Sequence, residues 1–200
     1  SITASNTING SGLINDFHDN NGNAVSMWHT NHNPESGRAA KGTVQSPAWL
    51  KFDFGKIEMI SDIAIWNHNQ YNLTDRGIRK CYIAYSEDGI RWTRLQDGEN
   101  DFFIIPRGTG EARMPASLHI AELDVNARYL VLSADSSEGN YGSDIYGLSE
   151  IRFFSRLNLP HIRFPLYKSL TLESEMGLLR LPDGTGRSLK LRFNAEKSYL

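Results

Sequence analysis

Cysteine is nearly absent from this chain, and that scarcity limits its chemistry. Cys81 is the only cysteine among the 200 residues. A single thiol can form no intramolecular disulfide and no cysteine-rich zinc site. The surrounding residues in CYIAY alternate like those of a strand, so we expect a buried, unreactive thiol.

Long apolar runs and a strong net charge are also missing. No apolar run approaches the length needed to cross a bilayer, which predicts no membrane span. The net charge is −2, which argues against a nucleic-acid-binding protein. The first residues, SITASNTINGSG, contain neither the basic nor the apolar region of a signal peptide. We therefore expect a mature secreted protein or a part of a larger one.

Helical periodicity is scarce, whereas strand patterns recur along the chain. Leu50, Phe52 and Phe54 alternate with polar residues in WLKFDFG, the period-two pattern of a half-buried strand. Similar short runs rich in β-branched or aromatic residues cover 62–66, 81–86, 91–95, 102–106, 118–123, 128–133 and 150–154. Turn residues separate them at 54–56, 87–89, 96–98 and 137–140. The pattern predicts an all-β, antiparallel β-sandwich or jelly roll, with a hairpin around Asp88-Gly89.

Two regions depart from this pattern. Residues 15–47 are polar and rich in Asn, Gly and Ser, and so long an irregular stretch in a compact domain is usually functional. Past Phe154, prolines punctuate a few strand-like segments, among them LLRLPDG and SLKLRF. We expect the sandwich to cover 1–157. Residues 158–200 would form a short β-rich C-terminal extension or the start of a following domain.

Five segments occur in an order that points to a known family: NGNAVSMWHT (21–30), WLKFDFG (49–55), IAIWNHN (63–69), RGIRKCYIAYSEDGIRW (76–92) and YGLSEIRFF (146–154). Over roughly residues 5–155 the chain resembles the discoidin (coagulation factor five/eight type C) domain, in particular the bacterial branch that includes family 32 carbohydrate-binding modules. The resemblance implies a galactose-binding-domain-like sandwich. Vertebrate members typically join their two ends by a disulfide, which a single cysteine cannot form, and this favours a bacterial sugar-binding module.

The resemblance also implies a function. We expect a non-catalytic carbohydrate-binding module that tethers a secreted, multidomain glycan-active enzyme to its polysaccharide or glycoconjugate. Its ligand would be a galactose-type or uronic sugar, and its other partners the remaining domains of the parent protein. We expect a monomer located outside the cell, in the extracellular space, at the cell surface or in the periplasm.

In modules of this family the sugar site lies on loops at one end of the sandwich, which correspond here to 28–38, 66–76 and 136–146. An aromatic face covers the C–H patch of a sugar, and planar polar side chains bind its hydroxyls. The predicted carbohydrate-binding residues are His29, Asn67, His68, Tyr71, Arg76, Tyr141 and Tyr146. Related modules often place an arginine early in the middle loop and an asparagine just before its glycine.

Here the two residue types are exchanged, because Asn67 or His68 stands near the first position and Arg76 precedes Gly77. This exchange predicts a sugar site that uses different side chains from those of the related modules. Alternatively, Arg76 braces the loop, His29 is an ordinary surface histidine, and the tyrosines only pack the loops. We assign the neighbouring Trp28 to the core.

A structural calcium ion is a second implication of the family. Its members hold the ion with an Asp-Gly-Asn turn before the tryptophan and a glutamate in the last strand, and calcium prefers six to eight oxygen ligands. The corresponding residues here are Asp19, Asn21, Asn23, Ser26 and Glu150. Asn21 in place of an aspartate removes one negative charge, for which Asp19 could compensate. The alternative is a turn held by hydrogen bonds alone.

Two other functions remain open. His29 and His32 with His18 or His68 could form a zinc site of an enzyme, but no HExxH, nucleophile elbow or P-loop accompanies them. A carboxylate pair for glycoside hydrolysis is defined by its separation in space rather than in sequence. A protein- or lipid-binding discoidin domain would expose apolar residues on its loops, and 28–38 has none.

Overall fold

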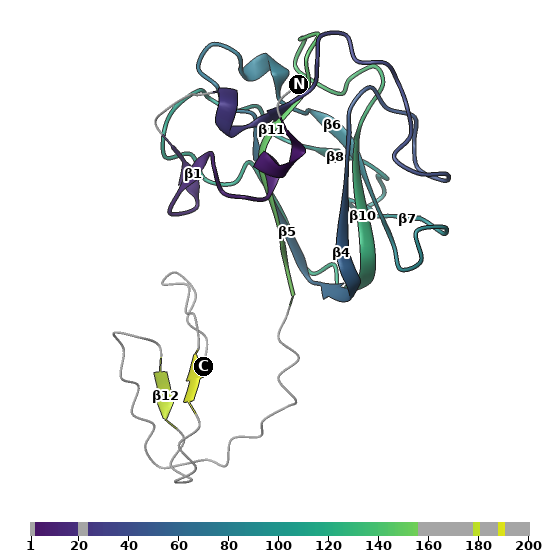
Figure 1. The fold of residues 1–200 in the computed structure, drawn as a ribbon, viewed down its shortest axis with the longest axis vertical. Helices are drawn as coiled ribbons and strands as arrows, with labels where there is room; N and C mark the ends of the chain where they lie inside the picture. The colour runs from purple at the N-terminus through teal and green to yellow at the C-terminus, as the bar shows by residue number, and fades with distance from the viewer. Residues whose placement is uncertain (1–2, 20–23, 156–177, 181–187, 191–200) are drawn as a thin grey trace. The chain divides into compact units, whose positions relative to one another are not determined.

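The computed structural model describes residues 3–19, 24–155, 178–180 and 188–190. The chain divides into two units, 1–157 and 158–200. The first unit is an antiparallel β-sandwich, which confirms the predicted fold class (Figure 1). No helix among the described residues is long and apolar enough to cross a membrane.

Two sheets form the sandwich. The first has the order β4 (Trp49–Ile60), β10 (Val125–Ala134), β6 (Lys80–Ser86) and β7 (Thr93–Arg94), with β8 (Phe103–Ile104) also paired to β6. The second has the order β3 (Trp28–His29), β11 (Gly147–Phe154), β5 (Asp62–Asn67) and β9 (Leu118–Ile120). A small hairpin of β1 (Leu13–Ile14) and β2 (Phe17–His18) and the 3-10 turns η1 (Ala4–Thr7), η2 (Ala24–Ser26) and η3 (Thr74–Arg76) lie outside the two sheets.

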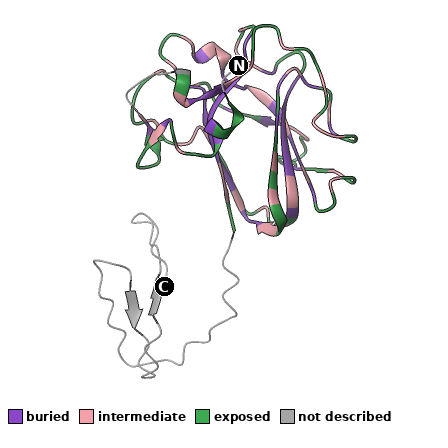
Figure 2. Ribbon diagram, in the orientation of Figure 1, coloured by how far each residue is buried: buried purple, intermediate pink, exposed green. Residues whose placement is uncertain are grey.

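The core lies between the two sheets because alternate residues of each strand face inward. Leu130 and Ile83 of the first sheet join Ile65 and Ile151 of the second in one buried cluster. Figure 2 shows buried stretches of the strands in purple. Trp28 and Cys81 belong to the same cluster, as predicted. Burial raises the pKa of the Cys81 thiol to about 12, so the thiol stays protonated and unreactive.

The structure corrects one predicted turn and confirms one hairpin. Residues 54–56 do not reverse the chain. Instead, β4 continues to Ile60 and contains a bulge. Asp53 pairs with Tyr129 of β10, and the next paired residue of β4, Glu58, pairs with Ala127, so β4 has more residues than β10 between these two pairs. Gly55 takes a φ of 77° within this bulge. The predicted hairpin around Asp88-Gly89 joins β6 to β7.

In the second unit, β12 (Leu178–Arg180) pairs antiparallel with β13 (Ser188–Lys190). These strands fall within the predicted segments LLRLPDG and SLKLRF. The other strand-like sequence expected past Phe154 lies outside the described residues.

Candidate functional site

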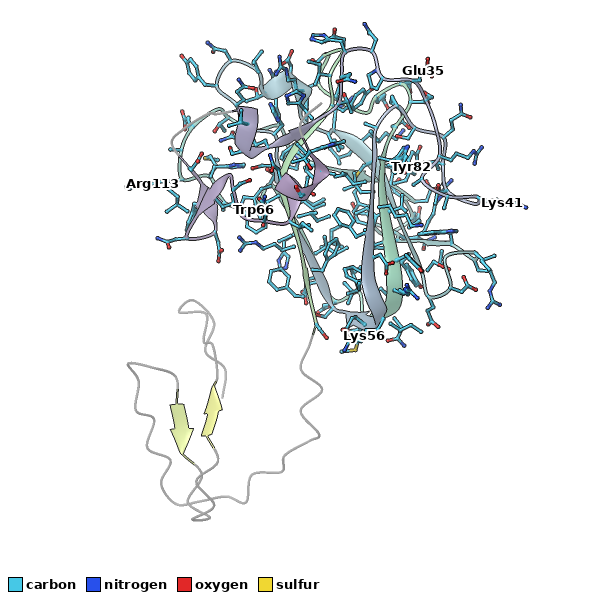
Figure 3. All side chains as sticks on the ribbon, in the orientation of Figure 1. Glu35, Lys41, Lys56, Trp66, Tyr82 and Arg113 are labelled. Carbon is cyan, nitrogen blue, oxygen red and sulfur yellow. The ribbon has the colours of Figure 1, made fainter. Side chains whose placement is uncertain are left out.

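Four loops meet at one end of the sandwich, following β3, β5, β8 and β10. Glu35 lies at this end and Lys56 of the β4 bulge at the other (Figure 3). Backbone hydrogen bonds join the loops, from Thr30 N to Tyr146 O at 2.9 Å and from Tyr141 N to Asp75 O at 3.0 Å. The loop end is therefore one connected surface, formed from segments far apart in the sequence.

A polar group built around Asp144 lies on this surface. His32 Nδ1 is 2.7 Å from Asp144 Oδ2. This hydrogen bond lowers the pKa of Asp144, and the nearby charge of Arg76 lowers it further, so the carboxylate is ionised at neutral pH. Arg76 also donates a 3.4 Å hydrogen bond to Gln70 Oε1. A carboxylate, a guanidinium, an imidazole and an amide are thus brought together, and sequence reasoning had identified only Arg76 for this site.

His29 lies beside this group and is partly exposed. Its Nδ1 is 2.8 Å from the carbonyl oxygen of Thr30, and since a carbonyl only accepts, Nδ1 carries the proton. In the neutral ring, Nε2 is then the hydrogen-bond acceptor. The position and chemistry of His29 fit a residue that accepts a hydrogen bond from a ligand hydroxyl.

Asn67 and His68 lie elsewhere than predicted, since both are completely buried. Asn67 Nδ2 donates to the carbonyls of Ile78 at 2.7 Å and Pro106 at 2.9 Å, and its Oδ1 accepts from the backbone N–H of His68. Burial lowers the pKa of His68 to about 3, which keeps the ring neutral. We therefore assign the Asn67 side chain to holding the loops together. The His68 ring is enclosed in the interior, where neither ring nitrogen has a hydrogen-bond partner among the described residues, so the ligand contact expected for both residues is corrected.

The three predicted tyrosines differ in exposure. Tyr71 is 69% exposed and is free to present its ring to a ligand. Tyr141 is partly buried, and its hydroxyl donates to the carbonyl of Ile105 at 2.6 Å. Tyr146 packs against the core, which leaves Tyr71 as the most accessible aromatic of the three.

The predicted calcium ligands are only partly described, because Asn21 and Asn23 lie outside the described residues. Glu150 is buried, with Oε2 accepting from Gly10 N at 2.9 Å and Oε1 from Arg152 Nε at 3.1 Å. Arg152 also stacks 5.1 Å from the ring centroid of Trp66, which is labelled in Figure 3.

The remaining predicted ligands contribute backbone contacts in this region. Asp19 N donates to Gly12 O at 3.0 Å, and Ser26 O accepts from Ser11 Oγ at 2.7 Å. Within the described ranges no group of three His, Cys, Asp or Glu side chains could hold a metal. Of the predicted ligands that the structure describes, Asp19 and Glu150 carry carboxylates, and that of Glu150 is already paired with the guanidinium of Arg152.

Two packed antiparallel sheets with polar loops joined at one end define a loop-presenting β-sandwich domain. The sequence profile of the F5/8 type C domain matches residues 1–147, and the chain belongs to this family. This is the discoidin family that the ordered segments indicated. No curated protein matches the chain at a significant level.

Solved structures of the same fold include several sugar-binding domains. A CBM32 module from a GH31 protein, solved with GalNAc, has a TM-score of 0.50 and 14% identity over 78% of this chain and 89% of its own. A CBM32 module of a family 31 glycoside hydrolase from Clostridium perfringens has a TM-score of 0.45 and 15% identity over 78% of this chain and 86% of its own. The lectin domain of lectinolysin, solved with Lewis B antigen, has a TM-score of 0.43 and 14% identity over 78% of this chain and 89% of its own. At 14% identity, the likeness to the GalNAc-bound module bears on the fold alone.

Proposed function

We propose that this domain binds carbohydrate at the loop end of the sandwich and catalyses no reaction itself. The observation that carries the proposal is the exposed ring of Tyr71 close in sequence to Arg76, which lies beside the ionised Asp144. A sugar needs an apolar face for its C–H groups and fixed planar polar groups for its hydroxyls, and this surface offers both. His29 adds a hydrogen-bond acceptor at its edge.

The expected ligand is a galactose-type or uronic sugar, bound weakly, with a dissociation constant of about micromolar to millimolar for one site. Such an affinity suits a module that keeps an attached enzyme near a polysaccharide or a cell-surface glycan, because tethering raises the effective concentration. We accordingly propose a secreted or cell-surface bacterial protein in which this monomeric domain accompanies a catalytic one. The sugar-binding neighbours named above support this proposal by fold.

A glycan array followed by affinity electrophoresis on the retained glycan tests the proposal. The parent domain should be retarded, and Arg76→Gln, His29→Ala and Tyr71→Ala should each reduce the retardation at least tenfold. Arg128→Gln is a matched control, since it removes one arginine from β10, away from the loop end. Binding by all three variants as tight as the parent's would mean that the site lies elsewhere.

A second candidate is attachment to a lipid surface, and one observation favours it. The hairpin of β1 and β2 pairs Ile14 with Phe17, and these side chains are 62% and 44% exposed. Apolar side chains on a protruding hairpin can insert between lipid headgroups. Sedimentation with anionic phospholipid vesicles would detect this, and loss of sedimentation in Ile14→Ser/Phe17→Ser would assign it to the hairpin.

A further inference from the structure

Arg107, in the loop between β8 and β9, has no acidic partner in the part of the chain that the structure describes. Its Nε donates a 2.9 Å hydrogen bond to Thr74 Oγ1, and its guanidinium carbon lies 5.8 Å from the ring centroid of Tyr141. Among residues 3–19 and 24–155, no carboxylate oxygen lies within 4.0 Å of this guanidinium and neither Nη donates a hydrogen bond. The group is therefore held at its Nε and over an aromatic ring, while both Nη atoms remain available for a ligand.

Buried amide groups hold the loop that carries Arg107. Asn67 Nδ2 fixes the carbonyl of Pro106, the residue directly before Arg107. Asn69 Oδ1 accepts from Gly110 N at 2.8 Å, and Asn69 Nδ2 donates to Glu111 O at 2.6 Å. A guanidinium on such a loop loses little conformational entropy when it binds a ligand.

The exposed ring of Tyr71 belongs to the same surface. Gly110 has a φ of +78°, and a Cβ added to it would lie 3.3 Å from Tyr71 Cα and 3.6 Å from Thr74 Cγ2. The glycine thus allows the two loops to touch. Thr74 contacts Arg107 through Oγ1 and approaches Gly110 through Cγ2, so Tyr71 and Arg107 are both near neighbours of Thr74.

We propose that Arg107 binds an anionic group, a carboxylate or a sulfate ester, of a sugar whose ring covers Tyr71. Two Nη donors in one plane can each donate a hydrogen bond to an oxygen of either anion. A neutral hydroxyl can accept such a bond, but it is not attracted by the positive charge of the guanidinium. Two carboxylates of the loop end are already paired, since Asp144 pairs with His32 and Glu138 with Arg79 and Lys80. Asp75 Oδ1, next to Thr74 in the chain, is buried without a hydrogen-bond partner among the described residues. The inference rests on the proposed carbohydrate binding and narrows it to acidic glycans.

Isothermal titration against three polymers tests this preference: polygalacturonate, a sulfated galactan and a neutral galactan. We expect at least one acidic polymer to bind tenfold or more tightly than the neutral one, and the preference to fall as the salt concentration rises. Tighter binding of polygalacturonate assigns the anion as a carboxylate, and tighter binding of the sulfated galactan assigns it as a sulfate. Either result supports the inference.

Three variants of this domain complete the test. Arg107→Gln should bind acidic and neutral polymers equally, and Arg107→Lys should keep only part of the preference, because it retains the charge but not the planar pair of donors. Arg91→Gln removes the same charge from the exposed turn between β6 and β7 and should behave as the parent. The side chain of Arg107 is exposed, so the variants should fold, and matching urea midpoints check this.

The two proposals fail in different ways. If the parent binds the neutral galactan as tightly as the acidic polymers, or if Arg107→Gln keeps the preference, the inference about Arg107 is overturned and the carbohydrate-binding function stands. If the parent retains no glycan on the array and binds none of the three polymers, both are overturned.

Discussion

Asn67 donates a hydrogen bond from Nδ2 to the carbonyl oxygen of Pro106 at 2.9 Å, across 39 residues of the chain. This contact fastens the loop after β8 to the end of β5, where a second bond from the same amide reaches Ile78 O. Asparagine side chains bind sugar hydroxyls in other proteins, whereas Asn67 here holds in place the loop that carries Arg107.

Removing this amide should destabilise the domain. Asn67→Ala deletes two donated hydrogen bonds and one accepted bond in the interior and leaves carbonyl groups without partners, so the free energy of unfolding should fall by about 2–4 kcal/mol. Urea denaturation measures the change. Asn126→Ala, at an exposed position of β10, should alter it by less than about 0.5 kcal/mol. Equal effects of the two substitutions would contradict the buried bracing role.

The buried histidines should make the domain sensitive to acid. Burial lowers the pKa of His18 to about 4 and that of His68 to about 3, both below the value of 6.5 for an exposed histidine. Below about pH 6.5 the unfolded chain therefore binds more protons than the folded one, and stability declines as the pH falls towards these values. At pH 5 the loss should be about 2 kcal/mol for each histidine.

Urea titrations between pH 7.5 and 5 measure this slope. His18→Gln should make the dependence on pH shallower, because one of the two histidines no longer titrates. His119→Gln, at a side chain that is 58% exposed, should leave it unchanged. A stability that does not vary over this range would show that neither histidine is held neutral by burial.

The effect of calcium on the stability of the domain tests the predicted calcium site. We propose that Asp19, Asn21, Asn23, Ser26 and Glu150 hold the ion, so calcium should raise the melting temperature of the domain relative to a chelator, by linkage. Glu150→Gln should abolish the rise. If calcium leaves the parent unchanged, the cation that balances Glu150 is the guanidinium of Arg152, with which it already forms a 3.1 Å hydrogen bond.

The strands could be predicted from the sequence because their cause is local. Alternation in WLKFDFG places Leu50 and Phe52 on the core face. Asp88-Gly89 marks the loop 87–92 between β6 and β7, in which Asp88 Oδ1 accepts from the backbone N–H of Arg91. The bulge at Gly55 could not be predicted in this way, since it depends on how β4 pairs with β10. Glycine adopts a positive φ readily, and both a turn and a bulge can require one, so Gly55 is compatible with either structure.

The site was less predictable because its residues meet only after folding. The family resemblance marked 66–76 as a loop of the sugar site, but the burial of Asn67 depends on the loops that cover it. Arg107 approaches Thr74 across 33 residues, a contact that no local pattern encodes. One available signal was its segment PRGTG, since a Pro- and Gly-rich loop that carries an arginine at the end of a strand is a candidate binding loop.

An NMR titration with a retained glycan tests the central claim most directly. Our account predicts that backbone amide shifts change progressively with ligand at the loop end, at Gln70, Tyr71, Arg76, Arg107 and Asp144, and that amides of the β4 bulge near Lys56 stay unchanged. Shift changes confined to the β1–β2 hairpin or the β4 bulge, or no change at saturating glycan, would contradict carbohydrate binding at this surface.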